Sequence, residues 1–317
     1  MNMRGNYIIC TLAVIAYMGS CQSNRLPSEK TGNKPPIDSL SVRKELALPQ
    51  VPSSLTLPSE RAAYILAHYW EGLDLRDTLR SHNNGFMEQS IVNWLSLFPH
   101  ADEAVLPRCV DSALGRIVKD KEAFRLFTSV VERYLNDPNS PMRNETYYIL
   151  YLEGLLRLRG LPEEERLRPA YQLETARKNR PGSMATDFGY LTREGRRGRL
   201  HDTAAGSRLL LLFYDPACGH CAEILRTLQD SPVLHGLVVE KKLSVLAVYT
   251  EGDRELWKRT RGDMPAEWTV AMDTEGIVER HLYDLPAMPI LYQLDTDKTI
   301  LLKDPSSTDL EAWLLMN

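Results

Sequence analysis

The tetrapeptide Cys218-Gly219-His220-Cys221 lies between two segments of opposite character. Before it, residues 209–214 form a continuous apolar run that ends at Asp215. Such a run is typical of a buried strand in a parallel sheet, and we expect the strand to cover residues 208–214. After it, residues 219–230 favour an amphipathic helix. The sequence therefore predicts a C-x-x-C motif where a strand leads into a helix.

This position predicts different chemistry for the two cysteines. The free N–H groups and the dipole of a helix N-terminus stabilise an anion, so the thiolate of Cys218 is favoured there. A gap of two residues brings Cys221 within disulfide reach across one helical turn. We expect Cys218 to be the exposed attacking sulfur and Cys221 the buried resolving sulfur. A protonated His220 between them stabilises the Cys218 thiolate further.

A plain structural disulfide and half of a metal site are the alternative interpretations of the motif. The sequence has no second C-x-x-C and no His-x-x-x-His nearby, so we predict no metal site. A c-type haem attachment motif needs a histidine directly after Cys221, and that position is Ala222. We therefore expect a redox-active dithiol that uses no cofactor.

Two sequence motifs resemble the thioredoxin superfamily. Cys-Gly-His-Cys is also the active-site quartet of protein disulfide isomerases, and residues 288–295, Met-Pro-Ile-Leu-Tyr-Gln-Leu-Asp, are similar to the family's cis-proline strand. The lead-in at residues 182–188 resembles the TlpA/ResA branch of thiol–disulfide oxidoreductases. The resemblance covers residues 181–317. It implies that a cis Met288–Pro289 bond shapes the substrate groove beside the disulfide. It also implies protein thiols or disulfides as substrates, and an upstream redox partner.

Two positions depart from this family pattern. Many thioredoxins have a buried aspartate six residues before the first cysteine, where this chain has Leu212. TlpA/ResA proteins often have a glutamate three residues after the second cysteine, where this chain has Ile224. The usual proton acceptor for the buried cysteine is therefore missing from its usual place.

The N-terminus is predicted to be a lipoprotein signal peptide over residues 1–20. Arg4 precedes a short apolar core, and Met18-Gly19-Ser20-Cys21 resembles a bacterial lipobox. Cleavage leaves Cys21 as a lipidated N-terminus. An ordinary signal peptide and an uncleaved anchor are the alternatives. Gln22 after the cysteine favours the outer membrane of the cell envelope, and we expect the protein to face the periplasm.

Composition separates the rest of the chain into a tether and two domains. Residues 21–54 are rich in Pro, Ser, Asn and Lys, which predicts a flexible tether. The net charge of -4 gives no indication of a nucleic-acid partner. Of the 5 cysteines, only Cys109 has no predicted role in the signal, the lipid anchor or the dithiol. Its apolar surroundings in the sequence predict a buried, inert thiol.

Residues 55–180 carry apolar side chains at helical spacing and predict an all-α domain, with Ser59 and Asp120 as helix caps. Residues 181–317 predict an α/β thioredoxin-like domain, with a central sheet and helices on both faces. We expect its hairpin at 188–200, strands at 208–214, 243–249 and 268–272, helices at 219–230, 253–261, 274–282 and 309–315, and an antiparallel pair at 289–295 and 299–303. The arginine-rich run at 193–199 is predicted to be a solvated hairpin turn.

These features predict a membrane-anchored thiol–disulfide oxidoreductase. One alternative is a peroxiredoxin-like thiol peroxidase, but the sequence Asp215-Pro216-Ala217-Cys218 lacks the threonine which that family places before its reactive cysteine. A second alternative is a non-enzymatic binding lipoprotein in which the helical domain holds a partner.

Overall fold

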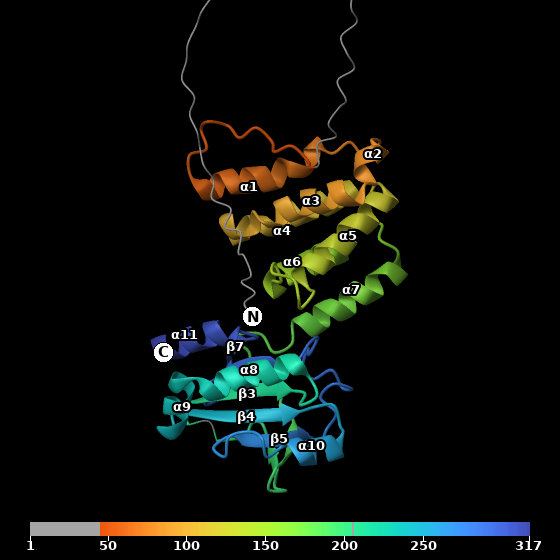
Figure 1. Cartoon of the computed structure of the whole chain (residues 1–317). Helices are drawn as coiled ribbons and strands as arrows, with labels where there is room; N and C mark the ends of the chain where they lie inside the picture. Colours follow the sequence, from red (N-terminus) through yellow and green to blue (C-terminus); the bar gives the residue numbers. More distant parts are fainter. Residues whose placement is uncertain (1–44, 205) are drawn as a thin grey trace, which may run out of the picture. The chain divides into compact units, whose positions relative to one another are not determined.

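The computed structural model describes residues 45–204 and 206–317 (Figure 1). The predicted signal peptide, the lipidation site at Cys21 and most of the predicted tether lie outside these residues. Leu46, still within the predicted tether, is buried, and its N–H donates to Ser90 Oγ at 2.9 Å. The packed chain therefore begins before residue 55. Within the described ranges, no helix has both the length and the apolar character that crossing a membrane requires.

The first part of the chain is helical. Asp120 caps its helix as predicted, because its carboxylate accepts the N–H of Ala123 at 2.9 Å. The predicted Ser59 cap is wrong: the helix begins one residue earlier at Pro58, whose missing N–H suits the first turn of a helix. The elements are α1 (Pro58–His68), η1 (Tyr69–Gly72), α2 (Thr78–Ser81), α3 (Asn84–Leu95), η2 (Phe98–His100), η3 (Glu103–Val105), α4 (Leu106–Ile117), α5 (Lys121–Leu135), α6 (Glu145–Arg157) and α7 (Glu163–Ala176).

These helices enclose a hydrophobic core of their own. Trp94 at its centre packs against Trp70 and Phe127, and its indole N–H donates to the carbonyl oxygen of Leu66. Cys109 lies in the same core, as predicted, and burial raises the pKa of its thiol. The helical part therefore packs around a core of aromatic side chains.

The second part of the chain is a seven-stranded mixed sheet with helices, which confirms the predicted fold class. The strand order is β2-β1-β5-β4-β3-β6-β7. The strands are β1 (Gly189–Thr192), β2 (Arg197–Arg199), β3 (Arg208–Tyr214), β4 (Leu243–Tyr249), β5 (Thr269–Asp273), β6 (Ile290–Leu294) and β7 (Ile300–Lys303). The helices are α8 (Gly219–Asp230), α9 (Pro232–Val239), α10 (Arg254–Thr260) and α11 (Ser307–Met316). Strands β3 and β4 and helix α8 have the predicted bounds.

The two faces of β3 belong to separate clusters of side chains, because successive residues of a strand point to opposite faces. Leu210, Leu212 and Tyr214 pack with apolar residues of α8, α9, α10 and α11. Leu209, Leu211 and Phe213 pack with residues of the segments 185–188 and 277–283. The apolar run that ends at the C-x-x-C motif is therefore the centre of the sheet.

The predicted helix at 274–282 is wrong, since this segment consists of turns. The Asp273 carboxylate accepts the backbone N–H groups of Glu275, Gly276 and Ile277, which closes a tight turn directly after β5. Gly276 then has a φ of 77° and His281 a φ of 50°. Both values lie in the left-handed region, which a right-handed helix cannot contain.

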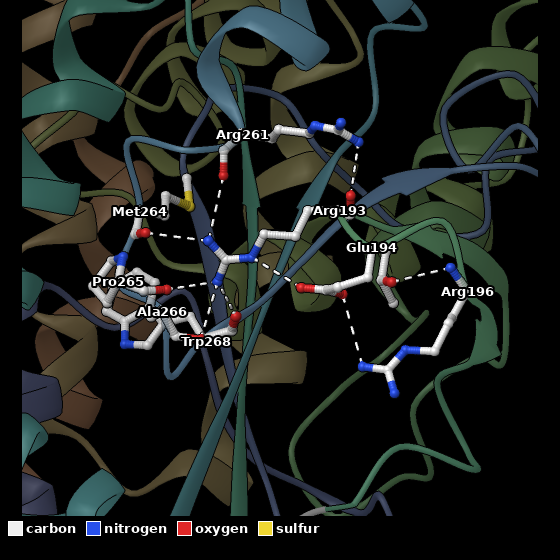
Figure 2. Close-up of polar contacts among 9 residues, drawn as sticks. Arg193, Glu194, Arg196, Arg261, Met264, Pro265, Ala266 and Trp268 are labelled. Atoms are coloured by element: carbon white, nitrogen blue, oxygen red, sulfur yellow. Dashed lines mark hydrogen bonds and ion pairs between the residues drawn. The ribbon is translucent and has the colours of Figure 1, made fainter.

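Arg193 lies in the β1–β2 hairpin and organises the loop between α10 and β5 (Figure 2). Its side chain is only 15% exposed, so for this residue the prediction of a solvated turn is wrong. Figure 2 shows the guanidinium at the centre of a ring of backbone oxygens, with Glu194 on its other side at 3.4 Å. The acceptors are the carbonyl oxygens of Arg261, Met264, Pro265, Ala266 and Trp268.

We predict that Arg193→Met lowers the free energy of unfolding by about 2–3 kcal/mol, because several part-buried carbonyl groups lose a charged donor. Arg196→Met is the matched control, since that side chain is 78% exposed and contacts Glu194 only at 3.8 Å. The control should change stability by less than about 0.5 kcal/mol. Urea unfolding of both variants measures the difference, and equal stabilities would contradict the role assigned to Arg193.

Candidate active site

Cys218 is the N-cap residue of α8. Its backbone is extended, and its Sγ accepts the N–H of Cys221 at 3.4 Å. The side chain is half-buried, so solvent reaches the sulfur. The Cys218 sulfur therefore lies at the N-terminus of α8, in contact with a backbone N–H.

Cys221 lies one turn further into α8. It is fully buried on the face of the sheet formed by Leu210, Leu212 and Tyr214. The backbone N–H of Asp215 donates to its Sγ at 3.5 Å. Burial raises the pKa of the Cys221 thiol to about 12. This sulfur therefore stays protonated at neutral pH, and Cys221 is the more buried of the two cysteines.

The two departures from the family pattern leave the surroundings of Cys221 apolar. Leu212 is fully buried beside it in the same cluster, and Ile224 packs against that cluster. Neither side chain can accept a proton. Glu223, which directly precedes Ile224 on α8, is exposed and points away to solvent.

Asp215 is the residue of this site that the sequence analysis did not identify. Its N–H contacts Cys221, its carbonyl oxygen accepts the N–H of Cys218 at 3.1 Å, and its carboxylate accepts the N–H of Ala217 at 2.9 Å. Burial is the main cause of the raised Cys221 pKa, and the hydrogen bond from the Asp215 N–H opposes it. The Cys218 sulfur raises this pKa further, and the negative charge of Asp215 makes the smallest contribution in the same direction. In the sequence, Asp215 lies between the strand and the motif, and its local pattern indicates only the end of the apolar run.

His220 is exposed, and its Nδ1 lies 3.9 Å from the Glu223 carboxylate. Among the described residues, no hydrogen bond joins its imidazole to either active-site sulfur. The proposed effect of His220 on the thiolate therefore stays a prediction.

Met288 and Pro289 lie against the motif although about seventy residues separate them from it in the chain. The Met288–Pro289 bond is cis, as predicted, and Pro289 is buried. The thiol of Cys218 points at the Met288 carbonyl oxygen at 3.8 Å. Antiparallel pairing of β3 with β6, in which Phe213 faces Ile290, brings the two motifs together.

The described residues hold no group of three or more His, Cys, Asp or Glu side chains arranged to bind a metal ion. The two sulfurs are not bonded to each other in this structure, which thus describes the dithiol form. The arrangement presents one accessible sulfur, one buried sulfur and a backbone carbonyl within one small region. These parts are sufficient for exchange between a dithiol and a disulfide.

Comparison with protein families matches residues 20–179 to a domain of unknown function (DUF5106). The chain belongs to this family. A crystal structure of a thioredoxin-like protein from Bacteroides caccae is 35% identical, with a TM-score of 0.80, and the match covers 86% of this chain and 98% of that one. A match of this length includes both the helical part and the sheet, so the two parts occur together in that thioredoxin-like relative.

Two shorter solved structures match a little under half of the chain. The C-terminal domain of an uncharacterized protein from Bacteroides fragilis is 40% identical, covers 43% of this chain and 98% of that one, and has a TM-score of 0.42. A domain of a possible thiol-disulfide isomerase from Cytophaga hutchinsonii is 26% identical, covers 44% and 94% respectively, and has a TM-score of 0.38. No curated protein matches the sequence.

We predict that Asp215→Asn lowers the pKa of Cys221 below the value of about 12. The amide oxygen still accepts the Ala217 N–H, so the turn is kept while a negative charge beside the thiol is removed. Carbon-13 NMR titration of cysteine Cβ atoms measures the change. Asp230→Asn at the end of α8 is the control and should leave the Cys221 titration unaltered. An unchanged pKa in Asp215→Asn would show that the charge of Asp215 does not contribute to it.

Proposed function

We propose that the chain is a membrane-anchored thiol–disulfide oxidoreductase that acts on protein thiols or disulfides in the periplasm. The observation that carries the redox part of the proposal is the asymmetry of the dithiol. Cys218 is accessible at a helix N-terminus, and Cys221 is buried directly behind it. The thioredoxin-like name of the relative from Bacteroides caccae supports the same activity.

The chemistry follows from this geometry. The Cys218 thiolate attacks one sulfur of a substrate disulfide, that disulfide breaks, and the other substrate sulfur leaves as a thiolate. Cys221 then loses its proton, and its sulfur attacks Cys218 in the mixed disulfide. The second substrate sulfur leaves, and the protein holds the Cys218–Cys221 disulfide. Two electrons have passed from the protein to the substrate, and the reverse sequence oxidises a substrate dithiol.

The neighbouring backbone supports the binding of a polypeptide at Cys218. The Met288 carbonyl oxygen faces the attacking sulfur, and Pro289 holds this segment at the start of β6. An extended substrate segment next to Cys218 can form backbone hydrogen bonds to the Met288 peptide group. We propose Met288 and Pro289 as the edge of the substrate groove.

The trapping of substrates tests the assignment of the two sulfurs. Cys221→Ser should accumulate mixed disulfides with substrate proteins that added thiol releases, because the resolving sulfur is absent. Cys218→Ser should trap few or none, and it should reduce insulin at least about 100-fold more slowly than the unaltered protein. Non-reducing electrophoresis and mass spectrometry measure the trapped species.

Cys109→Ala is the control for this experiment. Cys109 is buried in the helical core, so its removal should change neither trapping nor insulin reduction. Trapping by Cys218→Ser in place of Cys221→Ser would reverse the assigned roles. Peroxide consumption without insulin reduction would favour the peroxidase alternative, and absence of both activities would favour the binding lipoprotein.

The membrane anchor of the proposal rests on the sequence Met18-Gly19-Ser20-Cys21. We propose that a lipid on Cys21 attaches the protein to the cell envelope and that Gln22 directs it to the outer membrane. That the protein faces the periplasm is a separate part of the proposal.

Lipid labelling tests this anchor. We predict that Cys21→Ala abolishes the incorporation of labelled fatty acid and releases the chain from the membrane fraction. Cys10→Ala is the matched control, because Cys10 lies in the predicted signal segment and should not affect labelling. A wild-type protein that incorporates no lipid and is freely soluble would contradict the anchor.

A further inference from the structure

A cavity of about 250 Å³ lies beside the segment that leads to Met288 and Pro289. Helices α6 and α7 line one side with Tyr148, Tyr171 and Thr175. The turn segment 278–286 lines the other side with Val278, Tyr283 and Pro286. The cavity is therefore a place where the helical part and the active-site segment face the same volume.

The size of this cavity indicates what it can hold. Sites for cofactors and other small molecules usually enclose about 300–1,000 Å³. At about 250 Å³ the cavity is smaller than this range, and it is open to solvent. One large side chain of a polypeptide fits such a volume better than a cofactor does.

Large apolar side chains are exposed at the mouth of the cavity, whose lining also includes the polar residues Asn136, Gln172, His281 and Asp284. Tyr171 is 49% exposed and Val278 is 39% exposed. Leu167 is 69% exposed and lies four residues before Tyr171 on α7, so it shares the same face of that helix. Exposed large apolar side chains gathered at the mouth of a cavity are typical of a binding surface.

Thr175 supplies a polar group on the side of the cavity that α7 lines. Its Oγ1 is buried and has no hydrogen-bond partner among the described residues. Because a buried hydroxyl is rarely left unpaired, it is available to a backbone group of a bound polypeptide.

Hydrogen bonds hold the two sides of the cavity in place. Tyr171 OH and His281 Nδ1 lie 3.1 Å apart, and Lys178 Nζ donates to the His281 carbonyl oxygen at 3.1 Å. Asn179 Nδ2 donates to the Leu282 carbonyl oxygen at 2.8 Å. The site is thus formed before a ligand arrives, which reduces the conformational entropy that binding would cost.

The cavity is close enough to Cys218 for one substrate segment to reach both. Pro286 is two residues from Met288, so their Cα atoms are at most about 7.6 Å apart. The Met288 carbonyl oxygen is in turn 3.8 Å from Cys218 Sγ. An extended chain advances about 3.3 Å per residue, so three to five residues cover the path from the sulfur to the cavity.

We propose that this cavity binds a large apolar or aromatic side chain of the substrate protein, three to five residues from the cysteine that reacts with Cys218. This inference rests on the proposed function and gives the helical part a role in selecting substrates. The occupant is an extended segment of the protein substrate, because three to five extended residues span the distance from the reactive sulfur to a cavity with exposed apolar side chains at its mouth.

Single-turnover exchange with synthetic peptides tests the proposal. Each peptide has one central cysteine linked to glutathione, and tryptophan or serine at the third, fourth or fifth position on either side. Pre-reduced protein attacks the peptide sulfur, glutathione leaves as a thiolate, and Cys221 then releases the peptide thiol. The protein ends as the disulfide, so the two electrons balance without another reductant. Oxidised glutathione serves as the small substrate that cannot reach the cavity.

The wild-type protein should react about tenfold faster with a tryptophan peptide than with its serine counterpart, because burial of the ring favours the complex. Tyr171→Ser, which removes a large apolar side chain from the mouth, and Thr175→Met, which fills the cavity, should reduce this preference to about twofold or less. Both variants should react with oxidised glutathione at an unchanged rate, which shows that the dithiol is intact. Leu79→Ser is the control, since that exposed apolar residue lies on α2 and outside the cavity.

Equal rates with all tryptophan and serine peptides in the wild type would overturn the proposal. A tryptophan preference that survives in both cavity variants would overturn it too. If the wild type reacts with neither the peptides nor oxidised glutathione, the proposed redox function fails. In that case, the binding of a labelled tryptophan peptide with serine in place of cysteine, measured by fluorescence anisotropy, tests the cavity by itself. Binding that is lost in Tyr171→Ser and Thr175→Met supports the site, and no binding to the wild type overturns it.

Discussion

The antiparallel pairing of β3 with β6 is the constraint on which the active site depends. Leu209 to Phe213 face Leu294 to Ile290 in this register, and both strands are buried. The end of β3 leads into the C-x-x-C motif, and the start of β6 follows Met288 and Pro289. A shift of one residue would turn every side chain of β6 to the opposite face. Because both faces are packed, the sheet holds Cys218 and Met288 together without a direct covalent connection.

The same sheet separates the chemistry of the two sulfurs. Cys218 lies outside the packed core, at the first residue of α8, where a backbone N–H reaches its sulfur. Cys221 lies inside the core, where burial raises its pKa to about 12. One helical turn therefore spans the boundary between solvent and the apolar interior. Neither Leu212 nor Ile224 supplies an acidic group at that boundary, so the Asp215 backbone N–H is the polar contact of Cys221 there.

The segment 274–289 contacts both the end of the helical part and Cys218. Its turns cover the face of the sheet formed by Leu209, Leu211 and Phe213, and Met288 near its end contacts Cys218. Residues 281–282 of the segment accept hydrogen bonds from side chains at the end of the helical part. Lys303 at the end of β7 also contacts Glu145 of α6, with only 8% of the Lys303 side chain exposed. These contacts place the helices of the DUF5106 family beside the segment that contacts Cys218.

The sequence by itself determined the elements whose patterns are local. Strands β3 and β4 and helix α8 have their predicted bounds. A short apolar run with polar residues at its ends indicates a buried strand, and apolar residues at helical spacing indicate a helix with one buried face. The difference in burial between Cys218 and Cys221 was predictable for the same reason, because it depends only on where helix α8 begins.

Only the tertiary structure decided the features that depend on contacts between distant segments. Residues 274–282 form turns because the Asp273 carboxylate binds three successive N–H groups, which overrides the local helical preference. The Arg193 side chain is mostly enclosed because its hairpin lies beside the loop 261–268, so its guanidinium donates to backbone carbonyls of that loop. The cavity near Met288 likewise needs α6, α7 and the turn segment together. Local patterns do not encode such neighbours, because the register of the sheet and the packing of whole elements set them.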